Sequence, residues 1–482
     1  MRNRARSYSK GIVFVLTLFM GMLAFAETSA TQMPKGGTSV YSQNKAAKND
    51  ESFHATLDLE VKAISYTESS NVDSNSQQQA QIGLDVKKQG TFFTESNIVL
   101  GTFSEPHSFY YAAPEVYAGY GSQQSNVVVG RKLENLSFAD SFFHLGLIQA
   151  NSTNDNINFI EGGLTGISAR YYNDSMGLLV NYMPIFLPNQ GPQLKAEDGK
   201  IVSSNRWASS PPSKFKFGNE HKNINYAIRD YNIADIVSNS GFMLHGFIGQ
   251  NKKTRPVFQF TYAKKPVNEI ALSRDTYSDI SNFEGYVFLT PIVLTHEVQA
   301  MDLNLDYENF SSTFSYLADQ PQNIDAKNLE VMQNLMPLKV ISFYASLDLS
   351  DNFHKKVDVY VATAVIAGGE IKDVNREKKQ STFNVSTSRT LFKKPLRLGL
   401  KGEIFFIYNE ALEADANMTY DQELKGSLLS LQFRYSPTKQ MKVSLGADII
   451  GVENALPSDQ QGNFLDQNKA NDRFFAGISY VF

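Results

Sequence analysis

The sequence predicts an all-β chain that forms a transmembrane, antiparallel, up-and-down β-barrel of about eighteen strands, with sixteen strands as the alternative. Three observations predict this fold. Most of the chain from residue 53 onward alternates apolar and polar residues with a period of two. The connections between the alternating segments are short and long by turns. The final segment is apolar on one side and ends on Phe482.

The first 26 residues have the layout of a secretory signal peptide. Basic residues within 1–10 precede the almost wholly apolar run 11–23, and Ala24-Phe25-Ala26 supplies small residues at a cleavage point before Glu27. That run is shorter than the roughly 20 residues a membrane-spanning helix needs. We therefore expect a signal peptide at 1–26, a flexible polar periplasmic leader at 27–52 and an outer-membrane barrel with long extracellular loops at 53–482.

The alternation predicts a strand in each segment because successive side chains of a strand point to opposite faces, and one face of a barrel wall meets lipid. Most segments have nearly the ten residues that a tilted strand needs to cross a bilayer. The predicted strands are 53–66, 77–87, 91–103, 109–121, 124–131, 157–172, 174–187, 239–250, 255–267, 286–308, 310–318, 339–349, 355–367, 379–391, 395–408, 423–435, 440–451 and 472–482.

Every second connection is short, as expected of the periplasmic turns of such a barrel. The predicted periplasmic turns are Lys88-Gln89-Gly90, the neighbourhood of Gln123, Asn173-Asp174, Asn251-Lys252-Lys253, Glu308-Asn309, Ser350 to His354, Lys393-Lys394-Pro395 and Ser436-Pro437-Thr438. The remaining connections are long, apart from Ser104 to Ser108: they are 67–76, 132–156, 188–238, 268–285, 319–338, 368–378, 409–422 and 452–471. A soluble sandwich or propeller has no reason to alternate connection lengths in this way.

Composition excludes several functions. The chain has no Cys, so thiolate chemistry, Cys-ligated metal and a disulfide scaffold are excluded. The net charge of -4 implies no strong attraction to nucleic acid. A mean hydropathy of -0.29 suits a barrel whose lumen is wet. The seven His are scattered, and no nucleophile elbow or phosphate-binding loop is present. We expect no enzyme, no catalytic residues, no cofactor and no metal.

The final segment places Phe474, Ala476, Ile478, Tyr480 and Phe482 on one side and small residues on the other. It resembles the C-terminal strand of Gram-negative outer-membrane proteins, in which a terminal Phe is part of the signal for the barrel-assembly machinery. With the signal peptide and the strand pattern, the chain resembles porin-like barrels. The resemblance implies residence in the outer membrane and contact with its lipid and lipopolysaccharide. It leaves a homotrimer open as the assembly.

A barrel of this size leaves an aqueous channel. Acidic positions on the inner face cluster at 302–306 and 358, and basic ones at 397–442, so facing walls of opposite charge would order polar solutes. The alternative is a solvated wall whose charges only keep the lumen wet. The lumen-lining candidates are Asp302, Asp306, Asp358, Arg397, Lys401, Glu403, Arg434 and Lys442.

Connection 188–238 is far longer than an ordinary loop. It is rich in Pro and holds the one Trp of the chain, so its constriction-loop candidates are Arg206 and Trp207. Folding into the lumen is one expectation, in resemblance to the infolded loop of porins, and an extracellular cap is the other. The next candidate for a constriction is 132–156, which carries a series of apolar residues.

The expected function is a porin-like channel for the diffusion of small hydrophilic solutes across the outer membrane. One alternative is a barrel that exports or anchors surface polysaccharide and holds sugars with lumen aromatics. Another is a structural or adhesion barrel whose outer loops meet a partner. A sealed lumen would indicate the last of these, and sugar-dependent block of ion current would indicate saccharide handling.

Overall fold

The structure is a computed structural model. It describes residues 52–68, 75–104, 108–122, 124–173, 175–191, 194–203, 205–208, 211, 213–217, 219–249, 256–279, 284–325, 330–350, 357–375, 388–407, 410–453 and 463–482. The predicted signal peptide and nearly all of the predicted leader lie outside these residues.

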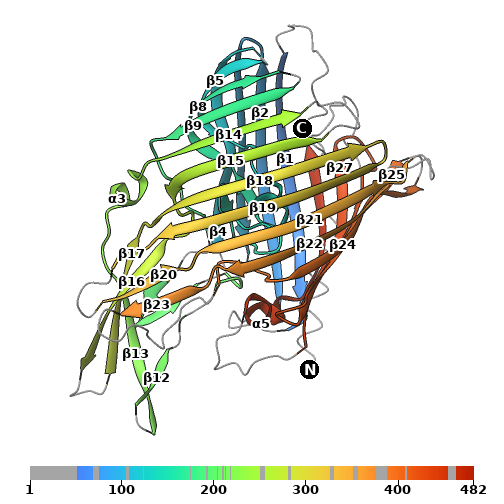
Figure 1. Ribbon diagram of the computed structural model, residues 1–482. Coiled ribbons are helices and arrows are strands. Elements are labelled where there is room, and N and C mark those ends of the chain that lie inside the picture. Colours follow the sequence, from blue (N-terminus) through green and yellow to red (C-terminus); the bar gives the residue numbers. More distant parts are fainter. Residues whose placement is uncertain are drawn as a thin grey trace, which may run out of the picture.

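Eighteen strands form one sheet in which each strand pairs antiparallel with its neighbours and the first pairs with the last. Figure 1 shows them as a tilted, closed wall. The strands are β1 (Ser52–Tyr66), β2 (Ser76–Gln89), β3 (Phe92–Phe103), β4 (Ser108–Gly121), β5 (Ser125–Lys132), β8 (Leu164–Tyr172), β9 (Met176–Met183), β14 (Gly241–Gly249), β15 (Val257–Pro266), β18 (Thr295–Tyr307), β19 (Phe310–Gln322), β21 (Leu338–Asp348), β22 (Val357–Gly368), β24 (Pro395–Ile407), β25 (Glu410–Asp421), β26 (Gly426–Tyr435), β27 (Met441–Val452) and β28 (Arg473–Val481). The predicted fold class and strand number are confirmed.

The barrel closes between β28 and β1. Asp58 pairs with Val481 in register, and Phe482 continues the ladder by donating its backbone N–H to the Leu57 carbonyl at 2.9 Å. The C-terminal strand therefore ends at Phe482, as predicted. Pairing the first strand with the last removes the unpaired edges that an open sheet would expose.

The wall has an apolar outer face and a polar inner face. On β1, Leu57, Leu59 and Val61 are exposed while Asp58 and Glu60 between them are partly covered. Exposed aliphatic and aromatic residues recur at every second position around the barrel. Exposing so much apolar surface to water would carry a large free-energy cost. The outer face is therefore the surface that meets lipid.

No helix among the described residues is long and apolar enough to span a membrane.

A pair of substitutions on β27 tests the assignment of faces. Leu445 is 55% exposed on the outer face, whereas neighbouring Ser444 faces the lumen. Leu445→Arg should lower the free energy of unfolding by about 2–4 kcal/mol because it places a cation in the hydrocarbon layer. Ser444→Arg should be far milder, because its side chain reaches water. Urea unfolding in lipid vesicles, followed by heat-modifiable gel mobility, measures both. Equal losses would contradict the assigned faces.

One predicted strand is wrong, and one barrel strand was not predicted. No barrel strand lies between β22 and β24, which pair directly with each other, so the strand expected at 379–391 is wrong. Residues 379–387 of that segment are outside the described part of the chain. The missing strand is β25, in a region expected to be a loop. Its outer face carries Ala414 and Ala416 beside Met418, and Ala is a weak strand signal.

Because β25 takes the place of the strand expected at 379–391, one predicted turn lies at the other end of the barrel. The Lys393-Lys394-Pro395 segment was expected at the periplasmic end. Instead, the backbone N–H groups of Lys393 and Lys394 donate to Asp421 at the opposite end of the barrel. One end of the barrel, which we call the turn end, then holds the connections 90–91, 122–124, 173–175, 250–256, 308–309, 349–356, 408–409 and 436–440. The loop end holds 67–75, 104–107, 133–163, 184–240, 267–294, 323–337, 369–394, 422–425 and 453–472.

The segment expected as one strand at 286–308 is two strands in different sheets. Pro291 lies near the end of β17 (Glu284–Ile292), and Leu294 is then buried against Val267 and Leu335. Burying that side chain turns the chain out of the wall before β18 begins.

A second sheet extends from the loop end (Figure 1). It has six strands in the order β12-β13-β17-β16-β20-β23, contributed by four different connections. The other strands of this sheet are β12 (Lys214–Phe217), β13 (Glu220–Ile228), β16 (Ala271–Asp279), β20 (Val331–Leu335) and β23 (Ile371–Asn375). The remaining small elements are α2 (Phe138–Phe142), β6 (Ala150–Ser152), β7 (Ile160–Gly162), β10 (Lys195–Glu197), β11 (Lys200–Val202), α3 (Ile233–Val237), α5 (Phe464–Asn468) and η2 (Lys469–Asn471).

Candidate functional site in the barrel lumen

The connection 133–163 between β5 and β8 turns into the barrel, and we call it the inner segment. Its central element is the short helix α2, which begins where the Ser137 hydroxyl accepts a hydrogen bond from the Asp140 backbone N–H. Ser is a favoured N-cap because its oxygen satisfies an unpaired N–H of the first turn. The helix ends before His144, whose φ of 57° is left-handed. The chain therefore reverses direction within the lumen.

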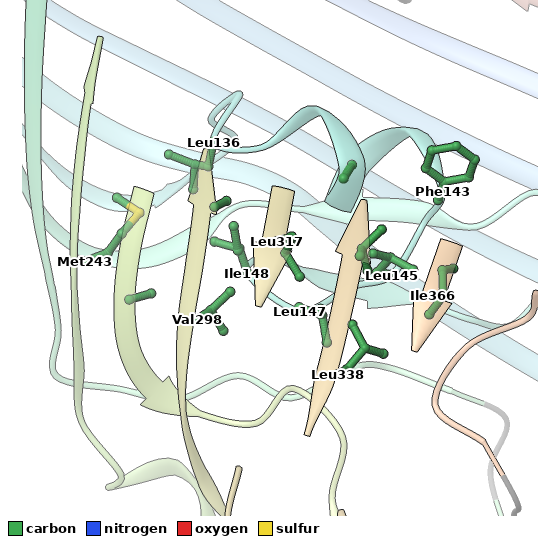
Figure 2. Packing of buried hydrophobic residues seen from close by; sticks show 14 of the residues in the cluster. Leu136, Phe143, Leu145, Leu147, Ile148, Met243, Val298, Leu317, Leu338 and Ile366 are labelled. Atoms are coloured by element: carbon green, nitrogen blue, oxygen red, sulfur yellow. The ribbon is translucent and has the colours of Figure 1, made fainter. Parts of the chain in front are cut away.

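An apolar cluster holds the inner segment against the inner face of the wall from β8 to β22. Figure 2 shows Leu147 and Ile148 of the segment lying toward Val298, Leu317 and Leu338 of the wall. Each buried Leu or Ile stabilises this seat by about 1.5–3 kcal/mol relative to exposure. The cluster comprises Leu136, Ala139, Phe143, Leu145, Leu147 and Ile148 from the segment and Leu164, Leu179, Met183, Met243, Ala263, Val298, Ala300, Leu317, Leu338, Val340, Ala362, Ala364 and Ile366 from the wall.

Two of the predicted lumen residues fasten the ends of α2. The carboxylate of Asp302 on β18 accepts a hydrogen bond of 2.8 Å from the Phe138 backbone N–H, at the start of the helix. The guanidinium of Arg397 on β24 donates to the Phe142 carbonyl at 3.4 Å and lies 5.2 Å from that ring centre. The first N–H groups and last carbonyls of a helix lack partners within it, and an acid at the start and a base at the end suit its dipole.

The inner segment then crosses to the opposite wall. There Arg473 of β28 donates to both carboxylate oxygens of Asp155, at 2.7 and 3.2 Å. The same guanidinium donates to Asp448 of β27 at 2.7 Å. The segment thus leaves the wall at β5, touches β18 and β24, reaches β28 and returns at β8, so it spans the lumen.

Burial raises the pKa values of two carboxylic acids in the inner segment, Asp140 and Glu161. Burial raises the pKa of Asp140, although its carboxylate accepts hydrogen bonds from the Leu147 and Ile148 backbone N–H groups. Burial, with the nearby Asp140, raises the pKa of Glu161 to about 7. The Glu161 carboxylate accepts hydrogen bonds from Ser141 and Gln149. Its charge therefore changes close to neutral pH.

The other predicted lumen residues lie on the inner face of the wall, where the structure brings some of them together. Asp358 on β22 and Asp415 on β25 flank Lys401 of β24 in register, so two carboxylates face one ammonium group. Arg434 donates to Gln432 of its own strand at 2.7 Å. Asp306, Glu403 and Lys442 occupy inner positions of β18, β24 and β27.

Arg206 and Trp207 lie at the loop end, fastened to the wall near β28. Arg206 donates hydrogen bonds to Asn471 and to the Ala470 carbonyl, and its guanidinium lies 3.9 Å from the Tyr66 ring centre. Trp207 is buried in a cluster with Phe392, Leu428, Ile450 and Leu465. The neighbouring Asn205 amide donates to the Asn154 carbonyl of the inner segment at 2.9 Å, so the two connections meet over the lumen.

Sequence reasoning missed the residues that fasten the inner segment, above all Asp155 and Arg473. An inward-facing Arg on the last strand was the available signal for this pair. Among the residues that the structure describes, no group of three or more His, Asp or Glu side chains is placed to hold a metal ion.

A closed eighteen-stranded antiparallel barrel, apolar outside and charged inside, defines a porin-like outer-membrane β-barrel. The chain is of this class, and its place is the outer membrane.

No protein-family profile and no curated protein matches the chain. Several solved structures are similar to it. OccK2 (OpdF) of Pseudomonas aeruginosa is 9% identical over 89% of this chain and 97% of that chain, with a TM-score of 0.45. OccAB3 of Acinetobacter baumannii is 10% identical over 89% and 99%, with a TM-score of 0.44. The outer-membrane protein OmpT of Vibrio cholerae is 8% identical over 91% and 99%, with a TM-score of 0.37. At these identities the likeness concerns the fold alone.

Proposed function

We propose that this protein is a channel, and not an enzyme, through which small hydrophilic solutes diffuse across the outer membrane. One observation carries the proposal: the inner segment spans the lumen and is bonded to the wall at Asp302, Arg397 and Arg473. An eighteen-stranded barrel is wide enough for an aqueous pore. A segment fastened on several sides narrows such a pore to the size of small solutes.

We place the constriction at the inner segment rather than at 188–238. The longer connection contributes β12 and β13 to the second sheet, outside the barrel wall. Its stretch around Arg206 and Trp207 caps the loop end and braces the inner segment through Asn205. In this proposal Arg206 and Trp207 fix the constriction in place, and the groups of the inner segment and the facing wall set its width.

A structural or adhesion function is the second candidate. The six-stranded sheet at the loop end favours it, because β12 and β23 are the ends of the strand order. Strands at a sheet edge carry unpaired backbone groups that can bind a partner strand. The channel proposal ranks first because the second sheet does not account for a charged lumen crossed by a fastened segment.

The proposal includes the expectations that the sequence raised for the rest of the chain. Residues 1–26 direct export, 27–52 form the periplasmic leader, and the barrel-assembly machinery inserts the barrel by its last strand. Lipopolysaccharide surrounds the loop end, where the long connections face outward. The oligomeric state to test first is a homotrimer.

Single-channel recording in a planar bilayer tests the function. In cells, the protein should fractionate with the outer membrane. In the planar bilayer, the refolded full barrel should conduct in discrete steps. It should also admit small sugars and amino acids in liposome-swelling assays, since its lumen is charged and wet. A correctly folded, heat-modifiable barrel that never conducts would overturn the channel proposal and favour the adhesion function.

A further inference from the structure

Four aromatic rings gather on the lumen face where α2 meets the wall. Phe138 and Phe142 come from the helix, and Tyr344 and Tyr360 come from β21 and β22. The two Phe rings stack with centres 5.1 Å apart. Tyr344 lies 5.0 and 5.3 Å from them, and Tyr360 lies 5.9 Å from Phe142. We call this group the aromatic platform.

The platform keeps part of its surface open. All four side chains are half-buried, although they stand beside a fully buried core. Tyr360 lies flat over Gly399 of β24, where a Cβ atom would come within 2.1 Å of the ring. A ring laid flat against the wall turns its other face to the lumen. In the described part of the chain, the Tyr360 hydroxyl has no hydrogen-bond partner.

The charges beside the platform are balanced. Arg397 lies against Phe142, and Lys401 follows four residues along β24. Asp358 and Asp415 flank Lys401 on the two neighbouring strands. Two cations and two carboxylates therefore line this part of the lumen. An anionic solute on the platform would meet two carboxylates, and a cationic one would meet Arg397 and Lys401, so each would be disfavoured.

We infer that the aromatic platform binds a neutral, hydroxyl-rich ring, that is, a saccharide unit, as it passes the constriction. This inference rests on the proposed channel function and names the solute class for the same lumen. A sugar ring has an apolar C–H face that covers an aromatic ring and hydroxyl groups around its rim. The Tyr360 hydroxyl and the carboxylates of Asp358 and Asp415 are the polar groups that would hydrogen-bond to those sugar hydroxyls. Apolar surface with a few convergent polar groups is the usual make-up of a small-molecule site.

Three trisaccharides of different charge test the inference on the full barrel in a planar bilayer. Maltotriose is neutral, trigalacturonate is anionic and the trimer of glucosamine is cationic. Maltotriose should lower the single-channel current in a concentration-dependent way and at the lowest concentration of the three. A stronger block by either charged trimer, or a conducting channel that none of them blocks, would overturn the saccharide inference and leave the channel function standing. A barrel that never conducts would overturn both.

Variants of the platform locate the site. Tyr360→Leu and Phe142→Leu should each raise the half-blocking concentration of maltotriose by about fivefold, since each removes one ring face. The matched control is Phe475→Leu on β28, a lumen ring that lies over Gly446 and outside the platform. Its half-blocking concentration should equal that of the unmodified protein. Heat-modifiable mobility checks that each variant is folded. Equal block in the platform variants and the control would contradict the site.

Discussion

Shortening the inner segment should raise single-channel conductance several-fold. Residues 137–148 hold α2 and most of the apolar side chains that seat the segment. Their removal would open the middle of the lumen while the eighteen paired strands remain. The two ends lie close together, because the Glu134 backbone N–H donates to Gln149 at 2.9 Å and Gln149 donates back at 2.8 Å. A few Gly residues can therefore close the gap.

The matched control removes the β10–β11 hairpin at 195–202, which belongs to the connection 184–240 and packs Ile201 against the second sheet, outside the barrel wall. That deletion should leave conductance nearly unchanged. A second variant, Leu147→Asp, keeps the chain length and places a carboxylate on the buried seat of the segment. It should make the current noisier because the segment detaches. If the hairpin deletion raises conductance and the inner deletion does not, the constriction lies in 184–240 instead.

Arg473→Met should lower the free energy of unfolding by about 3–5 kcal/mol. The side chains of Arg473 and Asp448 are both 3% exposed, so removing the guanidinium strands a carboxylate with no counter-charge. The Asp155 carboxylate loses its two hydrogen bonds from Arg473 at the same time and keeps those from the Ile157 and Asn158 backbone N–H groups. This is the largest single-residue effect we expect, because the guanidinium joins the last two strands to the inner segment beside the closing seam.

Unfolding in urea, followed by gel mobility, measures the loss. Lys264→Met is the control, since the ion pair of Lys264 with Glu297 is exposed and worth only about 0.2–1 kcal/mol. Adding Asp448→Asn to Arg473→Met should restore part of the stability by removing the stranded charge. A loss no larger than that of the control would mean that Arg473 does not hold the seam.

The same contact implies an acid limit. Burial by itself would raise the pKa of Asp155, but the charge and hydrogen bonds of Arg473 hold it below its ordinary value. A depressed acid pKa contributes stability above the pKa of the unfolded chain, and this contribution is lost as the pH falls through the folded value. The contact therefore strengthens the barrel at neutral pH and weakens only in strong acid.

The sequence by itself determined the barrel and most of its strands. In β1 and β27 the period-two alternation is a local property, since adjacent side chains of any strand point to opposite faces. Large lipid-facing residues such as Leu59 and Leu445 make that pattern visible. Where the outer face is built from small residues, as at Ala414 and Ala416 of β25, the pattern weakens and the strand was missed. In 286–308 the alternation continues across a turn that only the burial of Leu294 reveals.

Only the tertiary structure decided which connection enters the lumen. Length and proline content favoured 188–238, yet the inner segment fits because its Leu147 and Ile148 meet inward-facing apolar residues on β18, β19 and β21. Those residues are far apart in the chain, so no local pattern pairs them. No local pattern distinguishes Asp302 and Arg397 from other lumen charges either. Their role depends on the backbone groups of Phe138 and Phe142, which lie beside them only in the folded barrel. The alternation of apolar and polar residues is a local property of the sequence. Which segment fills the lumen depends instead on long-range contacts, which form only when the barrel closes.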